Sequence, residues 1–180
     1  KRFVNELTTR DKASQAVLAQ PGGSAFLVFD GIIHKSLKQI DGYFELGLVK
    51  EGATLEELAK AMGVPGDVLT QSIETYNKFF DAKKDSEFGR ADLPRAIRTS
   101  KFYAIEIKPG IHYTMGGLKI NGETQVIGKN GQPVPGFFAA GEVTGGVHGK
   151  NRLGGNSISE TISFGRIAGA SALKQVMEAK

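Results

Sequence analysis

The sequence predicts an α+β protein of two lobes, an α-rich lobe over residues 1–110 followed by short β-strands and one long helix over residues 111–180. Three observations lead to this prediction. Apolar residues in the first lobe recur at helical spacing. After residue 110, short runs of β-forming residues are separated by Asn-Gly turns. A Pro-Gly pair at residues 109–110 separates the two patterns.

The first lobe opens with a helix and a strand. Residues 9–20 join a polar cap to good helix formers and stop at Pro-Gly-Gly, which predicts a helix. Residues 24–30 are an apolar run of strand length bounded by glycines, which predicts a strand. Residues 34–48 are mixed in character, and we expect a helix and a loop there.

Two helices joined by a turn follow, over residues 55–62 and 65–78. Thr54 and Glu57 form a capping-box pattern at the start of the first. The apolar residues of the second recur at helical spacing and are Val68, Leu69, Ile73, Tyr76 and Phe80. Residues 83–100 are polar, which predicts a loop.

The remaining elements are strands and a final helix. Strands are expected at residues 102–107, 117–120, 125–127 and 137–140. The Asn-Gly turns at residues 121–122 and 129–131 predict hairpin connections. The chain closes with a helix over residues 157–179, in which Gly165 and Gly169 lie four apart and permit close packing against another element.

Composition excludes several classes of protein. The chain has no cysteine, so it holds no disulfide, Cys-based zinc site or c-type haem attachment within its 180 residues. His34, His112 and His148 lack metal-ligand spacing, and no metal site is expected. The sequence contains no run of about 20 apolar residues that could span a membrane. The net charge of +4 is mild, and the basic residues are scattered among acidic ones, whereas a nucleic-acid binder more often has a basic stripe with interleaved aromatics. A weak positive balance suits an anionic substrate equally well.

The candidate functional residues gather in the glycine-rich residues 139–160. A strand, a Gly-Glu pair, further glycines and a helix follow one another, an order typical of dinucleotide sites in α/β sheets. Glu142 can accept hydrogen bonds from ribose or ribityl hydroxyls, or it is a solvated acid on a tight turn. The helix that opens at Ser157 can face a pyrophosphate or a flavin carbonyl, unless Asn156 or Ser157 simply caps it.

Four further residues are candidates. Arg152 lies between glycines in a loop that has little reason to hold an Arg except to aim it at a carboxylate, although a solvated Arg is the alternative. His112 can donate to a carboxylate, but a single His is more often structural, and Tyr113 by itself predicts a core position. Arg10 follows two threonines, which first suggests a helix N-cap with a local ion pair to Asp11.

Four segments together resemble the fumarate reductase/succinate dehydrogenase flavoprotein superfamily, and most closely its soluble flavocytochrome c fumarate reductases. They are residues 2–11, 112–117, 139–142 and 148–156. The resemblance runs almost end to end and covers only the C-terminal portion of the family's chains. Tyr113 stands where flavocytochrome-type members often carry His and other branches carry Tyr, and Lys150 stands where a small residue is expected.

The resemblance implies an FAD-dependent reductase of the C=C bond of an unsaturated dicarboxylate, with fumarate reduced to succinate. It implies that residues 1–110 are a capping (clamp) lobe and residues 111–180 are the C-terminal strands and helix of an FAD-binding α/β domain. Arg10 matches the proton donor, which adds a proton to the double bond that takes a hydride from FAD N5. Residues matching substrate contacts are His112, Arg152 and Gly155, and residues matching FAD contacts are Glu142, Ser157, Ile158 and Tyr113.

The chain has no Gly-x-Gly-x-x-Gly motif after an early strand, the usual site of the FAD pyrophosphate. Because it also begins at Lys1 and not at Met, we expect a boundary within a longer polypeptide. The expected partners are therefore the N-terminal FAD-binding half of the same enzyme and an electron-donor module or protein. FAD is expected to bind non-covalently, with haem c only in an upstream domain, and this segment alone is expected to be inactive.

Other interpretations stay open. The enzyme could reduce another α,β-unsaturated carboxylate, or the chain could be an isolated, non-catalytic lobe. The likeness to flavocytochromes predicts a periplasmic protein, while Tyr113 leaves a cytoplasmic one open.

Overall fold

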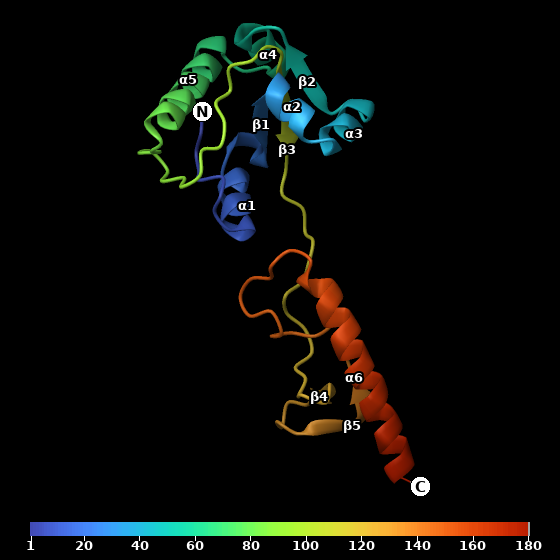
Figure 1. The fold of residues 1–180 in the computed structure, drawn as a ribbon. Coiled ribbons are helices and arrows are strands. Elements are labelled where there is room, and N and C mark those ends of the chain that lie inside the picture. Colours follow the sequence, from blue (N-terminus) through green and yellow to red (C-terminus); the bar gives the residue numbers. More distant parts are fainter. Residues whose placement is uncertain (180) are drawn as a thin grey trace. The chain divides into compact units, whose positions relative to one another are not determined.

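The computed structural model describes residues 1–179, and the chain divides into two units, Lys1–Gly110 and Ile111–Lys180 (Figure 1). The helices of the first unit are α1 (Arg10–Leu18), the short 3-10 helix η1 (Pro21–Gly23), α2 (Gly31–Ser36), α3 (Gln39–Glu45), α4 (Leu55–Met62) and α5 (Gly66–Ala82). Its strands are β1 (Ala25–Asp30), β2 (Val49–Gly52) and β3 (Phe102–Ile107). The second unit contains β4 (Gln125–Ile127), β5 (Pro133–Phe138) and α6 (Asn156–Glu178). This mixture of helices and antiparallel sheets confirms the α+β class.

A three-stranded antiparallel sheet lies at the centre of the first unit, in the order β1-β3-β2. The central strand β3 pairs with β1 through Tyr103 opposite Phe29, and with β2 through Tyr103 opposite Glu51. The sequence did not predict β2, because its four residues, Val-Lys-Glu-Gly, carry a weak strand pattern. Pairing with β3, some fifty residues later in the chain, makes this segment a strand.

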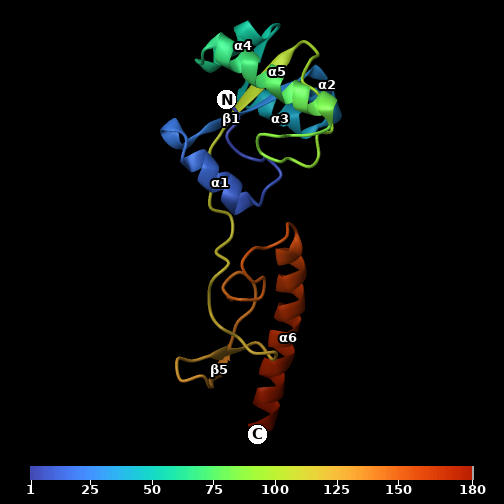
Figure 2. The ribbon, with the colours of Figure 1, turned by 90° about the vertical axis from the view of Figure 1, so that its left-hand side faces the viewer.

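Adjacent residues of β3 contribute to two separate cores because successive side chains of a strand point to opposite faces of the sheet. Ala104 belongs to a cluster with Leu58 and Ala59 of α4 and Leu69 and Ile73 of α5. Tyr103 belongs to a second cluster with Phe29 and Ile40, against which Ile33 and Phe44 pack. Helices α4 and α5 therefore cover one face of the sheet, and α2 and α3 cover the other (Figure 2).

The capping signal ahead of α4 is confirmed at atomic level. The hydroxyl of Thr54 accepts from the backbone N–H of Glu57 at 3.2 Å. The carboxylate of Glu57 reaches back to the N–H of Ala53 at 2.8 Å, one residue before the cap. Gly63, with φ of +73°, ends the helix in the left-handed conformation.

Helix α5 is longer than predicted, and fewer of its apolar residues face the core than the sequence pattern indicated. It continues to Ala82, four residues past the expected end, and Lys83 terminates it with φ of +50°. Leu69, Ile73 and Tyr76 are buried as predicted, whereas Val68 is exposed. The core-facing stripe therefore follows the 69–73–76 spacing.

The loop of residues 83–100 is held by polar side chains and contains no helix or strand, as expected. Asn77 donates to the carbonyl of Ile97 at 2.9 Å and accepts from its N–H at 2.8 Å. The buried carboxylate of Asp30 caps α2 and also accepts from the N–H groups of Arg98 and Thr99, both at 3.0 Å. These bonds fix the loop to α5 and β1.

In the second unit, β4 and β5 form a two-stranded antiparallel sheet. The prediction of a strand at residues 117–120 is wrong. Leu118 makes an isolated parallel bridge to Thr144, and Ile120 makes an isolated antiparallel bridge to Val126. Because the segment changes partner after each contact, no ladder forms. The prediction for residues 137–140 is also shifted, since β5 begins at Pro133 and ends at Phe138.

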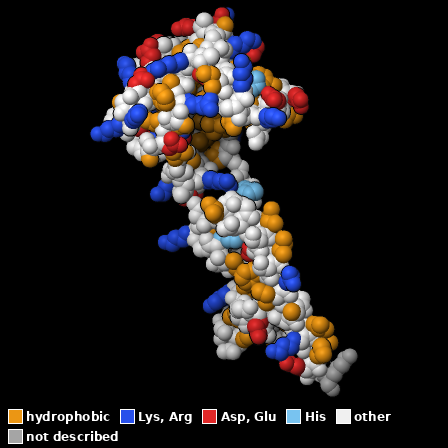
Figure 3. All heavy atoms as spheres, viewed as in Figure 1, with side chains coloured by type: hydrophobic (Ala, Val, Ile, Leu, Met, Phe, Trp, Pro, Cys, Tyr) orange, Lys and Arg blue, Asp and Glu red, His pale blue; other side chains and the backbone are white. Residues whose placement is uncertain are grey.

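Helix α6 confirms the final helix, but little of this chain covers it. Glu160 is its one buried residue among those the structure describes. A Cβ added at Gly165 or Gly169 would meet no atom within 4 Å, so the close packing expected there is absent from the described residues. Hydrophobic side chains lie exposed along this helix (Figure 3), and they include Ile158, Ile162, Leu173, Val176 and Met177.

Residues 1–179 lack two features that would point to a membrane or metal-binding role. No helix in this range is long and apolar enough to cross a membrane. The same range contains no group of three or more His, Cys, Asp or Glu side chains that could hold a metal ion.

Candidate functional site

The candidate site is built on two segments of the second unit that run side by side. The N–H of Leu118 donates to the carbonyl of Val143 at 2.8 Å, and the N–H of Gly145 donates to the carbonyl of Leu118 at 3.0 Å. A Cβ on Gly145 would lie 2.6 Å from the nitrogen of Gly117, and one on Gly117 would overlap the carbonyl oxygen of Val143. Glycine is therefore required at both positions for the backbones to approach this closely.

Glu142 is tied to the neighbouring segment although its side chain is exposed. Its Oε1 accepts from the N–H of Thr114 at 2.9 Å, and the Thr114 hydroxyl donates to the Glu142 carbonyl at 3.3 Å. The alternative of a freely solvated acid does not describe this geometry. The carboxylate is oriented by one oxygen and keeps acceptor capacity for a ligand hydroxyl.

Glu160 is a structural residue that the sequence analysis did not single out. Its buried carboxylate accepts from the N–H of Gly141 at 3.0 Å, while Thr144 donates its hydroxyl to the Gly141 carbonyl at 2.8 Å. Gly141 itself has φ of +80°. These contacts join the second turn of α6 to the turn that carries Glu142. The only sequence signal for this role of Glu160 was an acidic residue early in a helix.

The start of α6 lacks a side-chain cap. Gly155 occupies the N-cap position with φ of +86°, and no side chain caps the helix. The alternative interpretation, capping by Asn156 or Ser157, is therefore not what the structure has. Ser157, in the first turn of α6, lines the same pocket as Glu142.

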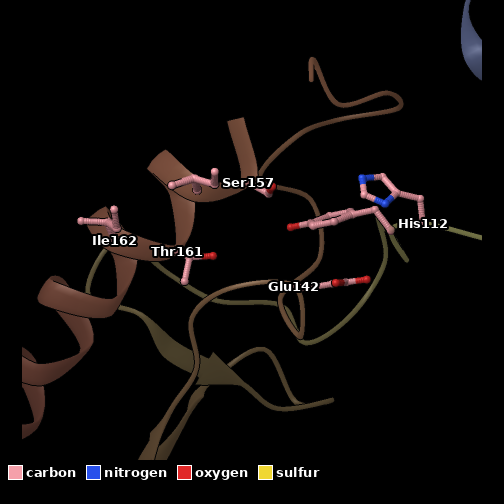
Figure 4. A pocket seen from close by; sticks show the side chains of 7 residues that line it. His112, Glu142, Ser157, Thr161 and Ile162 are labelled. Carbon is pink, nitrogen blue, oxygen red and sulfur yellow. The ribbon is translucent and has the colours of Figure 1, made fainter. Parts of the chain in front are cut away.

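These segments enclose an open pocket of about 360 Å³ (Figure 4). Ser157 and Thr161 lie on the α6 side, and His112 and Glu142 lie across from them. The full lining is His112, Tyr113, Glu142, Ser157, Ile158, Thr161 and Ile162. Five of the eight predicted site residues therefore meet in one pocket, while Thr161 and Ile162 were missed because they carry no motif.

Arg152 lies beside this pocket and does not line it. Its guanidinium carbon lies 4.5 Å from the centroid of the Tyr113 ring, and Nη1 donates to the carbonyl of Leu153 at 3.2 Å. Its Nε is buried and has no hydrogen-bond partner among the described residues. Arg152 is thus partly buried and held against an aromatic ring, unlike the solvated Arg of the alternative. Gly155 serves here as the N-cap of α6.

Tyr113 lies between two cationic or potentially cationic groups. Its ring also contacts His148 edge-on, with centroids 5.7 Å apart and an interplanar angle of 73°. The Nε2 atom of His148 is buried without a hydrogen-bond partner in the part of the chain that the structure describes. Burial, and then the negative charges of Glu160 and Glu142, raise the pKa of the Tyr113 hydroxyl, so it stays protonated at neutral pH.

Arg10 belongs to the first unit, whereas the other predicted site residues belong to the second. It is the first residue of α1, and its side chain is exposed. Thr9 occupies the N-cap position but makes no side-chain cap hydrogen bond. The sequence therefore predicted the N-cap position correctly, but the Thr9 hydroxyl makes no hydrogen bond to the backbone of the first turn.

The segment that leads to Arg10 is anchored by ion pairs which the sequence analysis missed. Arg2 pairs with Glu6 at 2.8 Å and with the buried Asp85 at 2.9 Å. The guanidinium of Arg2 also lies over the rings of Tyr76 and Phe88, 5.5 and 5.1 Å from their centroids. Burial opposes the charge of Arg2, but the hydrogen bonds to the two carboxylates outweigh burial and raise its pKa above its usual value.

The profile of the FAD-binding domain family matches residues 1–158 of the chain. The chain belongs to this family of FAD-dependent oxidoreductases. FAD is the family's cofactor, and the residues described above fit it. The uncapped start of α6 and the oriented Glu142 carboxylate are features suited to the phosphates and hydroxyls of a dinucleotide.

Individual relatives are similar over nearly the whole chain. The fumarate reductase (cytochrome) of Shewanella frigidimarina is 52% identical over 174 residues, covering 97% of this chain and 30% of the relative. The urocanate reductase of Eggerthella lenta is 36% identical over 178 residues, covering 95% of this chain and 29% of the relative. The chain therefore spans about a third of the length of these relatives.

A solved structure gives the same result in three dimensions. The open conformation of a flavocytochrome c3 fumarate reductase matches with a TM-score of 0.80 and 49% identity, covering 97% of this chain and 31% of that one. The resemblance to flavocytochrome c fumarate reductases that the sequence indicated is confirmed by these matches.

Proposed function

We propose that this chain is part of an FAD-dependent enzyme that reduces the C=C bond of an unsaturated dicarboxylate, with fumarate reduced to succinate. The observation that carries the proposal is the convergence of His112, Glu142 and the start of α6 on one pocket beside Arg152. The pocket offers both flavin-binding and carboxylate-binding groups. The names of the relatives, which include a fumarate reductase, support the same reaction.

FAD, when bound, supplies the hydride for one carbon of the double bond. On this side of the site, Glu142 accepts hydroxyl hydrogens and is oriented for that task by Thr114. Ser157 and Ile158 offer the first turn of α6, whose positive dipole end stabilises negative charge. Tyr113 is the fourth residue that matches a family FAD contact, and it lines the same pocket.

Substrate binding is the proposed task of His112, Arg152 and Gly155. The guanidinium of Arg152 presents donors in a planar fork that matches a carboxylate. Its buried, unpaired Nε is a donor that a bound anion would satisfy. His112 lines the pocket and can donate to a second carboxylate. Two donors of this kind favour a dicarboxylate over a substrate with a single anionic group.

Arg10 is the proposed proton donor, on the strength of the resemblance. An Arg retains its proton to a pKa above about 12, so it donates only if it is reprotonated through a relay. Its positive charge would also stabilise negative charge that develops on the substrate carbon. We assign the surrounding unit, Lys1–Gly110, as the capping lobe and Ile111–Lys180 as the C-terminal part of the FAD-binding domain.

One relative favours a second substrate class. The relative named urocanate reductase is 36% identical, so a different α,β-unsaturated carboxylate is the alternative substrate. The proposed partners are the N-terminal FAD-binding half, which would contribute the pyrophosphate site, and an electron-donor module that would carry any haem c. A periplasmic address follows the flavocytochrome resemblance alone, and cell fractionation would test it against a cytoplasmic one.

The decisive experiment compares two variants of the full-length, FAD-loaded enzyme. Arg10→Lys should lower kcat for fumarate about 10²- to 10⁴-fold, the range for loss of a general acid. Arg152→Ala should raise KM about 30-fold or more, because a desolvated carboxylate loses its charged partner. Arg98→Lys is the matched control, since Arg98 forms an exposed ion pair with Asp81 in the first unit.

Steady-state rates with a reduced dye as electron donor give both constants. Full activity of Arg10→Lys would disprove the acid assignment, and an unchanged KM in Arg152→Ala would disprove the carboxylate role. Parallel assays with urocanate decide between the two substrate classes.

A further inference from the structure

The position of the Arg152 guanidinium depends more on the Tyr113 ring than on the loop that carries Arg152. Its backbone lies between Gly149, with φ of +64°, and Gly155, with φ of +86°. Glycine-rich backbone has wide conformational freedom, and a long Arg side chain loses much rotamer entropy when it is fixed. Among the described residues, the Tyr113 ring contacts the guanidinium face at 4.5 Å and can offset part of that loss, beside the Nη1 hydrogen bond to the Leu153 carbonyl.

Tyr113 belongs to a segment that is itself fixed. Thr114, the next residue, donates its N–H to Glu142, and Leu118 exchanges backbone hydrogen bonds with the 143–145 turn. The ring therefore stands on backbone that is bonded on one side to the turn at the end of β5. An Arg on glycine-rich backbone next to a fixed aromatic face is an arrangement in which a cation–π contact can set the position of the cation.

His148 packs against the same ring. Its centroid lies 5.7 Å from that of Tyr113 at 73°, the T-shaped geometry that aromatic pairs favour. This contact restricts rotation of the Tyr113 ring, while Arg152 lies over the face of that ring. The three side chains form one cluster, in which Tyr113 is the central member.

We propose that Tyr113 is a positioning residue that holds the Arg152 guanidinium in the direction needed for a substrate carboxylate, with His148 fixing the ring. This inference rests on the proposed function and gives Tyr113 a task besides any flavin contact. The aromatic face carries the effect, and the phenol hydroxyl does not. The role therefore survives replacement by Phe and is lost on replacement by an aliphatic side chain.

The test uses the full-length, FAD-loaded enzyme with Tyr113→Phe and Tyr113→Leu. Tyr113→Leu should raise KM for fumarate about 2- to 30-fold, the range for loss of a cation–π contact. We expect kcat to change less than KM. Tyr113→Phe keeps the aromatic face and should recover the KM that Tyr113→Leu loses, to within about 2-fold of the parent. Titration calorimetry with malonate, a dicarboxylate without a double bond, should give the same ratios without turnover.

A double-mutant cycle separates positioning from a general structural role. In an Arg152→Ala background, Tyr113→Leu should cause no further loss of malonate affinity, because the group it positions is gone. Additive losses would overturn the inference. Loss of bound FAD, measured by flavin absorbance, with unchanged dicarboxylate affinity would also overturn it and leave Tyr113 as a flavin contact only.

Failure of the inference and failure of the proposed function give different results. If Arg152→Ala weakens malonate binding but Tyr113→Leu does not, the inference alone is wrong. If Arg152→Ala itself leaves malonate affinity unchanged, the carboxylate site of the proposed function is wrong, and the inference falls with it. Tyr113→Met provides a second aliphatic replacement of similar length should the Leu variant fail to fold.

Discussion

The two units of the chain bury their apolar residues very differently. Ten of the twelve buried apolar residues of the described chain lie in Lys1–Gly110, where they cover both faces of a three-stranded sheet. The unit Ile111–Lys180 has only Val126 and Ala139 in that set. Its main helix, α6, is 23 residues long and buries only Glu160.

The first unit therefore contains its own core, and we propose that the second contributes to a core shared with another part of the enzyme. The exposed face of α6 carries Ile162, Leu173 and Met177 beside the open Gly165 and Gly169. Since the chain spans about 30% of its fumarate reductase relative, we expect the remaining part of the enzyme to cover this face. The hydrogen bonds that hold Gly141 and Glu142, by contrast, are made within the second unit.

The largest expected effect is a difference in folding between the two units when each is expressed alone. Residues 1–110 expressed alone should give dispersed amide spectra and a cooperative thermal transition. Residues 111–180 alone should show neither, because too little apolar surface is buried to offset chain entropy. They should also fail to retain FAD, as judged by flavin absorbance after gel filtration. A cooperative transition of residues 111–180 would contradict the comparison.

Leucine truncation should reveal the same contrast within the 180-residue chain. Leu58 is fully buried and packs in the α4–α5 cluster, so Leu58→Ala should cost about 2–5 kcal/mol of unfolding free energy. Leu173 is 62% exposed on α6, and Leu173→Ala should change stability by about 0.5 kcal/mol or less. Urea denaturation measures both.

The full-length enzyme sharpens this prediction. There the cost of Leu173→Ala should rise toward that of a core residue, because the rest of the protein covers the helix. An equally small cost in the full-length enzyme would mean that the apolar face of α6 is not part of a shared core.

The next largest effect on stability should come from the buried carboxylate of Asp85. Asp85 accepts hydrogen bonds from Arg2 and from the backbone N–H groups of Glu87, Phe88 and Arg90. Asp85→Asn should cost about 2 kcal/mol at neutral pH, the value typical of hydrogen bonds to a charged group. The control Asp81→Asn, at an exposed ion pair, should cost about 1 kcal/mol at most.

The effect of Asp85 should depend on pH with a definite sign. Burial favours the protonated form, but the hydrogen bonds from Arg2 and the backbone outweigh burial and hold the pKa well below its usual range. A lowered folded-state pKa stabilises the fold above the unfolded value of about 3.9 and loses that stabilisation as the pH falls below it. Denaturation curves should therefore show wild type and Asp85→Asn converging below about pH 4. A constant difference from pH 7 to pH 3 would contradict this origin.

The smallest effect concerns helix capping in the first unit. Thr54→Ala should cost about 1 kcal/mol, because it removes the hydrogen bond to the N–H of Glu57. Thr9→Ala is the matched comparison at the N-cap of α1, where no side-chain cap bond exists, and should cost about 0.5 kcal/mol or less. Thermal melts of the three proteins test whether cap geometry or cap residue type decides stability.

Local structure could be predicted from the sequence wherever the signal was local. Helix α4 follows from Thr54, Glu57 and Gly63, because a cap, an apolar stripe and a stop lie within one short segment. Strand β1 follows from an apolar run bounded by glycines, and strand β3 follows from alternation of its residues. The residues of the candidate pocket could be named because glycine-rich motifs mark backbone that approaches a ligand.

Long-range contacts decided the rest. Strand β2 exists because β3 pairs with it, and the strand predicted at residues 117–120 is lost because its partners diverge. The sequence alone determined which residues of this protein carry chemical groups suited to a flavin and a carboxylate. Only the tertiary structure decided that Arg152 lies on Tyr113 and that Glu160 supports Gly141, since both contacts depend on where flexible, glycine-rich loops return in space.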